Sequence, residues 1–120
     1  MANEITVTGS LAVTNGTYVR RWQPSSFQVT QTNKGGSDIT FNVGTSAETL
    51  AFAEVGTYGW IGVTNLDATN FVTLGSTDAG ALQLRVEAGE SMAFRLEPGT
   101  TFEAKADTAA VELSCFLLED

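Results

Sequence analysis

Turn sequences recur at close intervals along the second half of this chain. Between residues 59 and 106, short apolar stretches are separated by NLDATN, GSTDAG, EAGE and EPGT. Glycine, asparagine and aspartate tolerate the backbone angles of tight turns, and proline presets one of them, so each sequence predicts a chain reversal. Reversals about every ten residues favour short strands. This pattern predicts roughly eight to ten strands in an all-β protein, a single-domain two-sheet β-sandwich of jelly-roll or Greek-key topology.

The apolar residues of these stretches alternate with polar ones, which is typical of strands with one buried face. The side chains expected to point into one core are Leu82, Leu84, Val86, Met92, Phe94, Leu96, Leu113 and Cys115. Cys115 is the single cysteine, so no intrachain disulfide can form, and we expect it to be a small buried apolar residue.

The middle of the chain continues the strand pattern less clearly. Residues 26–32 predict a strand with Phe27 and Val29 inward, and residues 39–43 predict the next one. Residues 47–55 contain good helix formers and could form one or two helical turns. Their shortness favours a strand that pairs with 39–43.

The N-terminal 25 residues differ from the rest, so we divide the chain into a strand or arm over 1–25 and a sandwich over 26–120. Residues 1–17 are rich in threonine and alternate only weakly, which fits an edge strand of the domain or an arm on a neighbour. The next residues crowd together the types found at interface hot spots. Tyr18, Arg20, Arg21 and Trp22 are therefore candidate protein-contact residues. The alternative is a strand end where Trp22 caps the core and the arginines are solvated.

The composition argues against catalysis and against most ligand classes. With no histidine, the chain lacks the usual proton shuttle and the commonest metal ligand. The formal net charge of −8 disfavours nucleic acid and acidic membranes. No loop has the spacing of an EF-hand, and alternation places the strand acids outward, where cross-strand ion pairs explain them. Glu97, Glu103 and Glu112 are the acids expected on strands, and Glu87 and Glu90 are expected on either side of a turn. We expect no enzyme activity, no cofactor and no metal.

Two further expectations concern location and ligands. MANEITVTG has no basic segment followed by a long apolar run, and no stretch approaches 18 apolar residues. We therefore expect synthesis in a cytoplasm without a membrane span. Carbohydrate binding is the main alternative to a structural role, because sandwiches often hold sugars on exposed aromatic rings. The candidates for that role are Trp22, Tyr58 and Trp60.

Three motifs resemble small virion proteins of tailed bacteriophages. They are NLD-x-TNFV at residues 65–72, EAGE-x-x-x-FRL-x-PG at 87–99, and A-x-AD-x-A-x-VEL at 104–113. The resemblance covers roughly the second half of the chain, and none of the motifs is catalytic. It implies a capsid decoration (cement) protein or a tail-associated structural protein. A decoration protein would bind the major capsid protein or another virion protein on the capsid surface, and we expect it to be a homo-oligomer, specifically a trimer.

Overall fold

The computed structural model describes residues 3–52, 55–75 and 84–120, which form two compact units. The first unit is Met1–Thr32 and the second is Asn33–Asp120. The division therefore falls after Thr32 rather than after residue 25, because the strand predicted over 26–32 pairs with the N-terminal tract. Each unit is described by itself.

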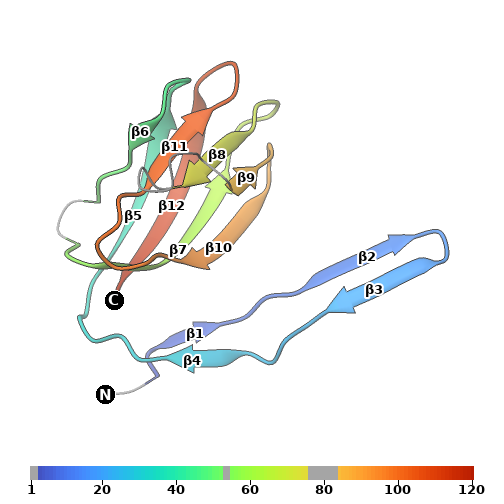
Figure 1. Ribbon diagram of the computed structural model, residues 1–120, viewed down its shortest axis with the longest axis horizontal. Helices are drawn as coiled ribbons and strands as arrows, with labels where there is room; N and C mark the ends of the chain where they lie inside the picture. The colour runs from blue at the N-terminus through green and yellow to red at the C-terminus, as the bar shows by residue number, and fades with distance from the viewer. Residues whose placement is uncertain (1–2, 53–54, 76–83) are drawn as a thin grey trace. The chain divides into compact units, whose positions relative to one another are not determined.

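The first unit is a two-stranded antiparallel ribbon (Figure 1). Strand β1 (Ile5–Val7) pairs with β4 (Phe27–Val29), and β2 (Leu11–Asn15) pairs with β3 (Tyr18–Trp22). The β2–β3 turn consists of Gly16 and Thr17, and Gly16 has a φ of 60°. Glycine at the first central position with positive φ is what a two-residue type II′ hairpin turn requires.

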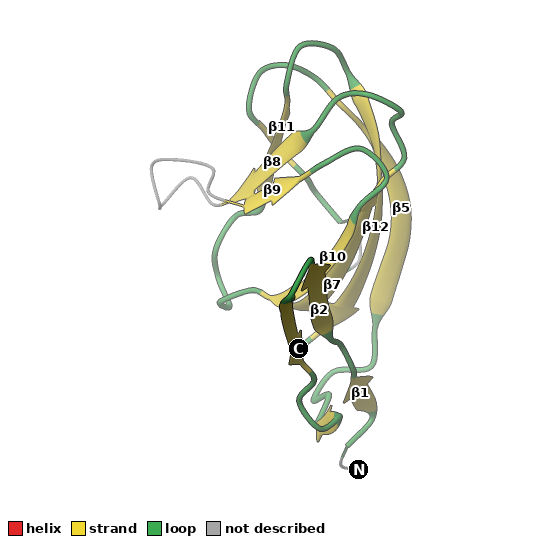
Figure 2. Ribbon diagram, turned by 90° about the vertical axis from the view of Figure 1, so that its right-hand side faces the viewer, coloured by secondary structure: helices red, strands yellow, loops and turns green. Residues whose placement is uncertain are grey.

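The second unit is a sandwich of two four-stranded antiparallel sheets, which lie as separate layers in Figure 2. One sheet has the order β10-β7-β12-β5, and the other has the order β6-β11-β8-β9. The strands are β5 (Gly36–Val43), β6 (Glu48–Thr49), β7 (Tyr58–Asn65), β8 (Val72–Gly75), β9 (Leu84–Val86), β10 (Ser91–Arg95), β11 (Glu103–Ala106) and β12 (Val111–Glu119). The prediction of an all-β two-sheet sandwich is confirmed, and the described residues contain no helix.

The strands of the sandwich pair in a nested order. The first, β5, pairs with the last, β12, and β6 pairs with β11. Inside these, β7 pairs with β10 and β8 pairs with β9. The first four strands, β5 to β8, therefore pair in reverse order with the last four, β9 to β12. Each sheet contains two strands from the first set and two from the second.

One apolar core lies between the two sheets and takes side chains from both. Its fully buried members are Val43, Ile61, Val63, Val111, Leu113, Cys115 and Leu117 from one sheet, and Val72, Leu74, Val86, Ala104 and Ala106 from the other. Leu50, Phe52, Val55 and Phe102 fill it from the connections. Met92, Phe94 and Leu96 are partly buried against the core. The inward positions predicted for these three, and for Val86, Leu113 and Cys115, are confirmed.

Three expectations about individual strands were wrong. Leu84 is 38% exposed, because it begins β9, which is the outer strand of its sheet. Phe27 is 47% exposed, because β4 belongs to the two-stranded ribbon and not to the sandwich. Of the described residues within 47–55, only Glu48–Thr49 form a strand, and this strand pairs with β11 and not with 39–43. Leu82 and the GSTDAG turn, apart from Gly75, fall outside the described residues.

The turns predicted from glycine and proline are confirmed where the structure describes them. In EAGE and EPGT the residues at the third position, Gly89 and Gly99, have φ values of 81° and 86°. The amide of Glu90 donates to the carbonyl of Glu87, and that of Thr100 donates to the carbonyl of Glu97. Positive φ at the third position is the feature of a type II turn that favours glycine.

A candidate protein-contact site on the N-terminal hairpin

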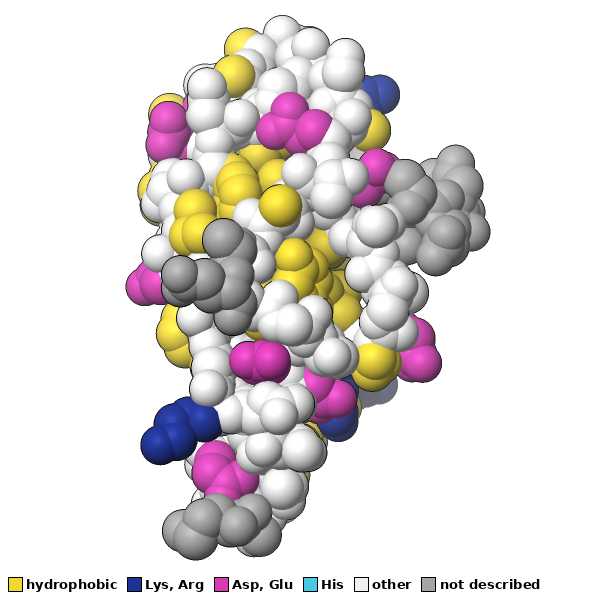
Figure 3. Space-filling model, turned by 90° about the vertical axis from the view of Figure 1, so that its left-hand side faces the viewer, with side chains coloured by type: hydrophobic (Ala, Val, Ile, Leu, Met, Phe, Trp, Pro, Cys, Tyr) yellow, Lys and Arg dark blue, Asp and Glu magenta, His cyan; other side chains and the backbone are white. Residues whose placement is uncertain are grey.

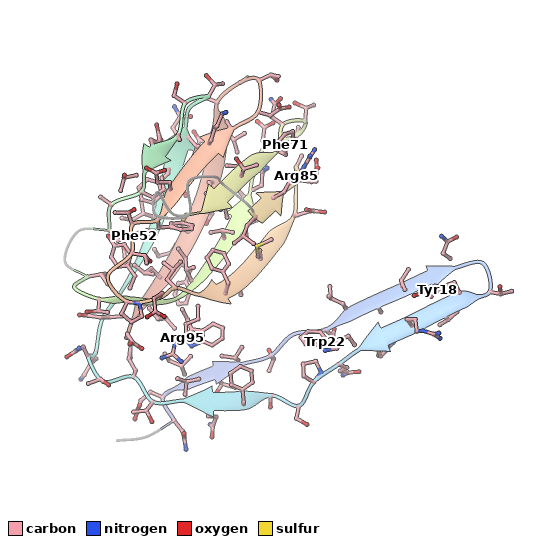
Figure 4. All side chains as sticks on the ribbon, viewed as in Figure 1. Tyr18, Trp22, Phe52, Phe71, Arg85 and Arg95 are labelled. Atoms are coloured by element: carbon pink, nitrogen blue, oxygen red, sulfur yellow. The ribbon has the colours of Figure 1, made fainter. Side chains whose placement is uncertain are left out.

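The β2–β3 hairpin carries all four residues that the sequence marked as candidate contacts. Tyr18, Arg20, Arg21 and Trp22 occupy β3, and every residue of β2 and β3 is exposed. In the first unit, described by itself, 60% of the Trp22 surface is exposed. Figure 4 shows Tyr18 and Trp22 at the two ends of β3.

The strand register decides which side chains share a face of the hairpin. Residues paired across antiparallel strands project to the same side, and successive pairs alternate. Leu11 pairs with Trp22, Val13 with Arg20, and Asn15 with Tyr18, so these six form one face. The other face carries the pairs Ala12–Arg21 and Thr14–Val19. A shallow hollow along the hairpin is lined by Leu11, Ala12, Val13, Arg20, Arg21 and Trp22.

The hairpin exposes an unusual amount of apolar surface for its size. Leu11 is 70% exposed, Val19 57% and Tyr18 55%. A two-stranded hairpin is at best marginally stable alone in water, since it has no second layer on which to bury its apolar side chains. Grouped exposed apolar residues of this kind mark interaction surfaces.

Within the described part of the chain, the arginines of the hairpin bond to groups on the same strand or just beyond it. The Arg20 guanidinium lies 5.2 Å from the centre of the Tyr18 ring and donates to the carbonyl of Val19. Arg21 donates to the side-chain oxygen of Gln23 at 3.2 Å. Neither arginine forms an ion pair with a described carboxylate. Both cations are therefore available to a partner.

The other two aromatic candidates for sugar binding are not displayed as Trp22 is. Tyr58 and Trp60 are partly buried on β7. The Tyr58 ring packs edge-on against Phe52, with centroids 5.4 Å apart, and its hydroxyl accepts the Phe52 amide at 3.0 Å. Tyr58 thus has a structural role, which the alternation of β7 did not reveal.

The charged side chains of the sandwich form local pairs and a dispersed acidic surface. Arg85 pairs with Glu87, and its guanidinium lies 3.6 Å from the centre of the Phe71 ring, while Arg95 pairs with Asp120 at 2.9 Å. Figure 4 shows Arg85 beside Phe71. On the face drawn in Figure 3, acidic side chains surround apolar ones that reach the surface. The described residues bring no three acidic or cysteine side chains together as a metal site.

Two titratable groups of the sandwich have shifted pKa values, and both shifts follow from structure. Asp67 accepts the amides of Asn70 and Thr69 at 2.7 and 3.0 Å, and these bonds lower the pKa of its carboxyl. Burial raises the pKa of the Cys115 thiol to about 12. A thiol that stays protonated is a poor nucleophile. Asp67 organises a turn and Cys115 fills the core.

The Asn65 side chain bonds to the backbone of its own turn from a fully buried position. Its side-chain oxygen accepts the Asp67 amide at 2.8 Å, and its amide group donates to the carbonyls of Asn70 and Val86. The NLDATN motif is therefore a turn held together by its own side chains.

No protein-family model matches this chain, and a search of the curated proteins finds no significant match. Among the residues that the structure describes, none forms a helix long and apolar enough to cross a membrane.

Proposed function

We propose that this chain is a non-enzymatic structural protein of a bacteriophage virion, a capsid decoration protein that binds and stabilises the major capsid shell. The observation that carries the proposal is the β2–β3 hairpin, whose exposed Tyr18, Arg20, Arg21 and Trp22 are the residue types of interface hot spots. The resemblance of residues 65–72, 87–99 and 104–113 to small phage virion proteins supplies the setting.

The sandwich is a jelly roll in this proposal. Nested pairing of β5 with β12, β6 with β11, β7 with β10 and β8 with β9 supports that topology, since a jelly roll is a long hairpin wound into two sheets. Jelly rolls are common in viral capsid proteins and in lectins. The topology therefore fits a virion protein without distinguishing it from a carbohydrate-binding module.

The proposed assembly is a homotrimer on the capsid surface, formed after synthesis in the host cytoplasm. A trimer at a three-fold position of the shell engages three identical neighbours, so it gains avidity without a new kind of contact. Among the described strands, β2 and β3 pair only with each other, so each has an outer edge to which an extended segment of a neighbour can add.

Immunogold labelling tests the proposal on particles produced from a phage genome that carries this chain. Antibody against the sandwich should label the capsid surface in negative-stain images, and a chain lacking residues 1–32 should leave the capsids unlabelled. Removing 1–17 alone is a poorer test because it strips β3 and β4 of their partners. Label on tails would favour the tail-associated alternative, and particles without label would overturn the virion assignment.

A polysaccharide pull-down tests the carbohydrate-binding alternative, which the exposure of Trp22 favours. Decoration requires no glycan, so we expect no retention on surface polysaccharides of the host. Retention that Trp22→Ala abolishes, and that Phe116→Ala leaves unchanged, would replace the structural role with sugar binding.

A further inference from the structure

The two units of the chain carry opposite net charges. Residues 1–32 hold two arginines against the single acid Glu4, a formal charge of +1. Residues 33–120 hold four basic residues against thirteen acidic ones, a formal charge of −9. Two hairpins of this kind would repel through their arginines, and two sandwiches would repel through their carboxylates. Electrostatics therefore favours a contact between a hairpin and a sandwich over contacts between like units.

The outer face of the sheet β10-β7-β12-β5 has an apolar residue where the alternation calls for a polar one. Phe116 lies on β12 between buried Cys115 and Leu117, and it is 52% exposed. Across the sheet it pairs with Asp38 on one side and Gly62 on the other, and Gly62 in turn pairs with Ala93.

The sheet is open beside the Phe116 ring. A Cβ added at Gly62 would meet no atom within 4 Å, and the next residue in the row is the small Ala93. Phe116 therefore stands at the side of a space where an apolar side chain of a partner can lie against the ring.

Acidic side chains border this face. Asp38 is the cross-strand neighbour of Phe116, and Glu112 lies on the same face of β12. Both are exposed, and neither forms an ion pair with any described residue. The face thus presents an apolar ring between unpaired carboxylates, as the hairpin presents apolar side chains between unpaired guanidinium groups.

We propose that the face formed by Asp38, Gly62, Ala93, Glu112 and Phe116 binds the β2–β3 hairpin of a second copy of this chain. Trp22, Leu11 and Val13 supply apolar surface against Phe116 and the space over Gly62. Arg20, which lies on the same face of the hairpin as these three residues, reaches the Asp38 carboxylate beside Phe116, and Glu112 adds negative charge to the same face. The contact joins two different surfaces, so it is heterologous and closes into a ring when the rotation between copies allows.

This inference deepens the proposed function, because it names the partner of the hairpin inside the proposed trimer. Its experiment needs no particle, so its failure is separable from failure of the virion assignment. If the protein binds the shell as a monomer, the capsids would still be labelled, and only the proposed contact between copies would be contradicted.

Sedimentation of purified variants tests the contact. The wild-type chain should form a species of three times 12.7 kDa. The association should weaken at least about ten-fold when salt rises from about 0.05 M to about 0.5 M, since added salt screens exposed charges. A hairpin variant, Arg20→Glu with Arg21→Glu and Trp22→Ala, should remain monomeric. A face variant, Asp38→Lys with Glu112→Lys and Phe116→Ser, should also remain monomeric.

Mixing the two defective variants is the decisive measurement. Each retains one intact surface, the hairpin on the face variant and the face on the hairpin variant, so the mixture should form a 1:1 complex and nothing larger. A control variant with the same charge reversals elsewhere, Glu97→Lys with Asp107→Lys, should associate like the wild type. If the face variant loses its sandwich circular dichroism spectrum, the double variant Asp38→Lys, Glu112→Lys without the Phe116 change serves instead. A monomeric wild type, a face variant that still associates, or a mixture that stays monomeric overturns the proposal.

Discussion

The sandwich and the β2–β3 hairpin use apolar side chains in opposite ways. In the sandwich, β12 alternates strictly enough that Val111, Leu113, Cys115 and Leu117 are all fully buried. In the hairpin, Leu11 and Trp22 are paired across the strands, yet both remain more than half exposed. Strand formation alone therefore does not bury apolar surface, because burial requires a second layer. The sandwich has that layer within its own fold, and the hairpin, described by itself, does not.

Leucine truncation should give the largest difference between the two units. Leu113→Ala removes a fully buried side chain, so it should lower the free energy of unfolding by about 2–5 kcal/mol. Leu11→Ala removes a side chain that is 70% exposed and should change it by less than about 0.5 kcal/mol. Urea unfolding followed by circular dichroism measures both. Equal losses for the two variants would contradict the comparison.

Two glycines of β7 sharpen the comparison within the sandwich. A Cβ at Gly59 would lie 3.1–3.2 Å from the backbone of Leu118 and Asp120, which cannot move as a flexible side chain can. Gly59→Ala should therefore cost about 1–3 kcal/mol, as overpacking does. Gly62→Ala enters open space and should change stability by less than about 0.5 kcal/mol. Thermal unfolding of the pair measures the difference, and the reverse order would mean that β7 pairs differently.

Acid should weaken the sandwich through Asp67. Its pKa in the folded state lies below the ordinary value of 3.8, so the carboxylate stabilises the fold wherever it is ionised in both states. This contribution to the free energy of unfolding is fully present at pH values above 3.8. It is lost as the pH falls through the lower pKa of the folded state. We expect a loss smaller than that of Gly59→Ala. Asp67→Asn removes the titrating group, so its unfolding midpoint should fall less steeply between about pH 5 and pH 2.5. Identical slopes for variant and wild type would refute this role.

Removal of residues 1–32 should have the smallest effect on the sandwich. Among the residues that the structure describes, the buried core cluster of the sandwich is drawn from Val43 to Leu117. The shortened chain should therefore unfold at the same urea concentration as the full chain. A large drop in the midpoint would show that the first unit stabilises the second and would break the contrast between them.

The sequence predicted the features of the fold that depend on neighbouring residues, namely the turns and the alternation of buried and exposed side chains along a strand. The EPGT turn follows from proline and glycine alone, and the inward face of β12 follows from alternation around Leu113. Pairing partners did not follow, because the match of Glu48–Thr49 with β11 depends on residues about fifty positions away. Exposure at a sheet edge was missed for the same reason. Alternation places Leu84 inward, but nothing in its neighbouring residues shows that β9 is an outer strand.

The sequence predicted the candidate contact residues on the hairpin but not Phe116 on the sandwich. The crowding of Tyr18, Arg20, Arg21 and Trp22 is visible in the sequence, and the structure exposes all four. Phe116 was overlooked because it lies in the apolar run SCFLL. The sequence nevertheless contained an indication, because Phe116 is apolar at a position where the alternation of β12 predicts a side chain that faces water.

The pairing of β5 with β12 has a mechanical consequence. The beginning of β5 lies beside the end of β12, and the Asn33 amide donates to the carbonyl of Asp120 at 3.2 Å. Tension applied between residue 33 and residue 120 therefore enters the sandwich at one end of a single strand pair. Such a pull opens the backbone hydrogen bonds one after another, whereas a pull from opposite ends would strain all of them together. A copy held through its hairpin and pulled at its C-terminus would unzip from that end.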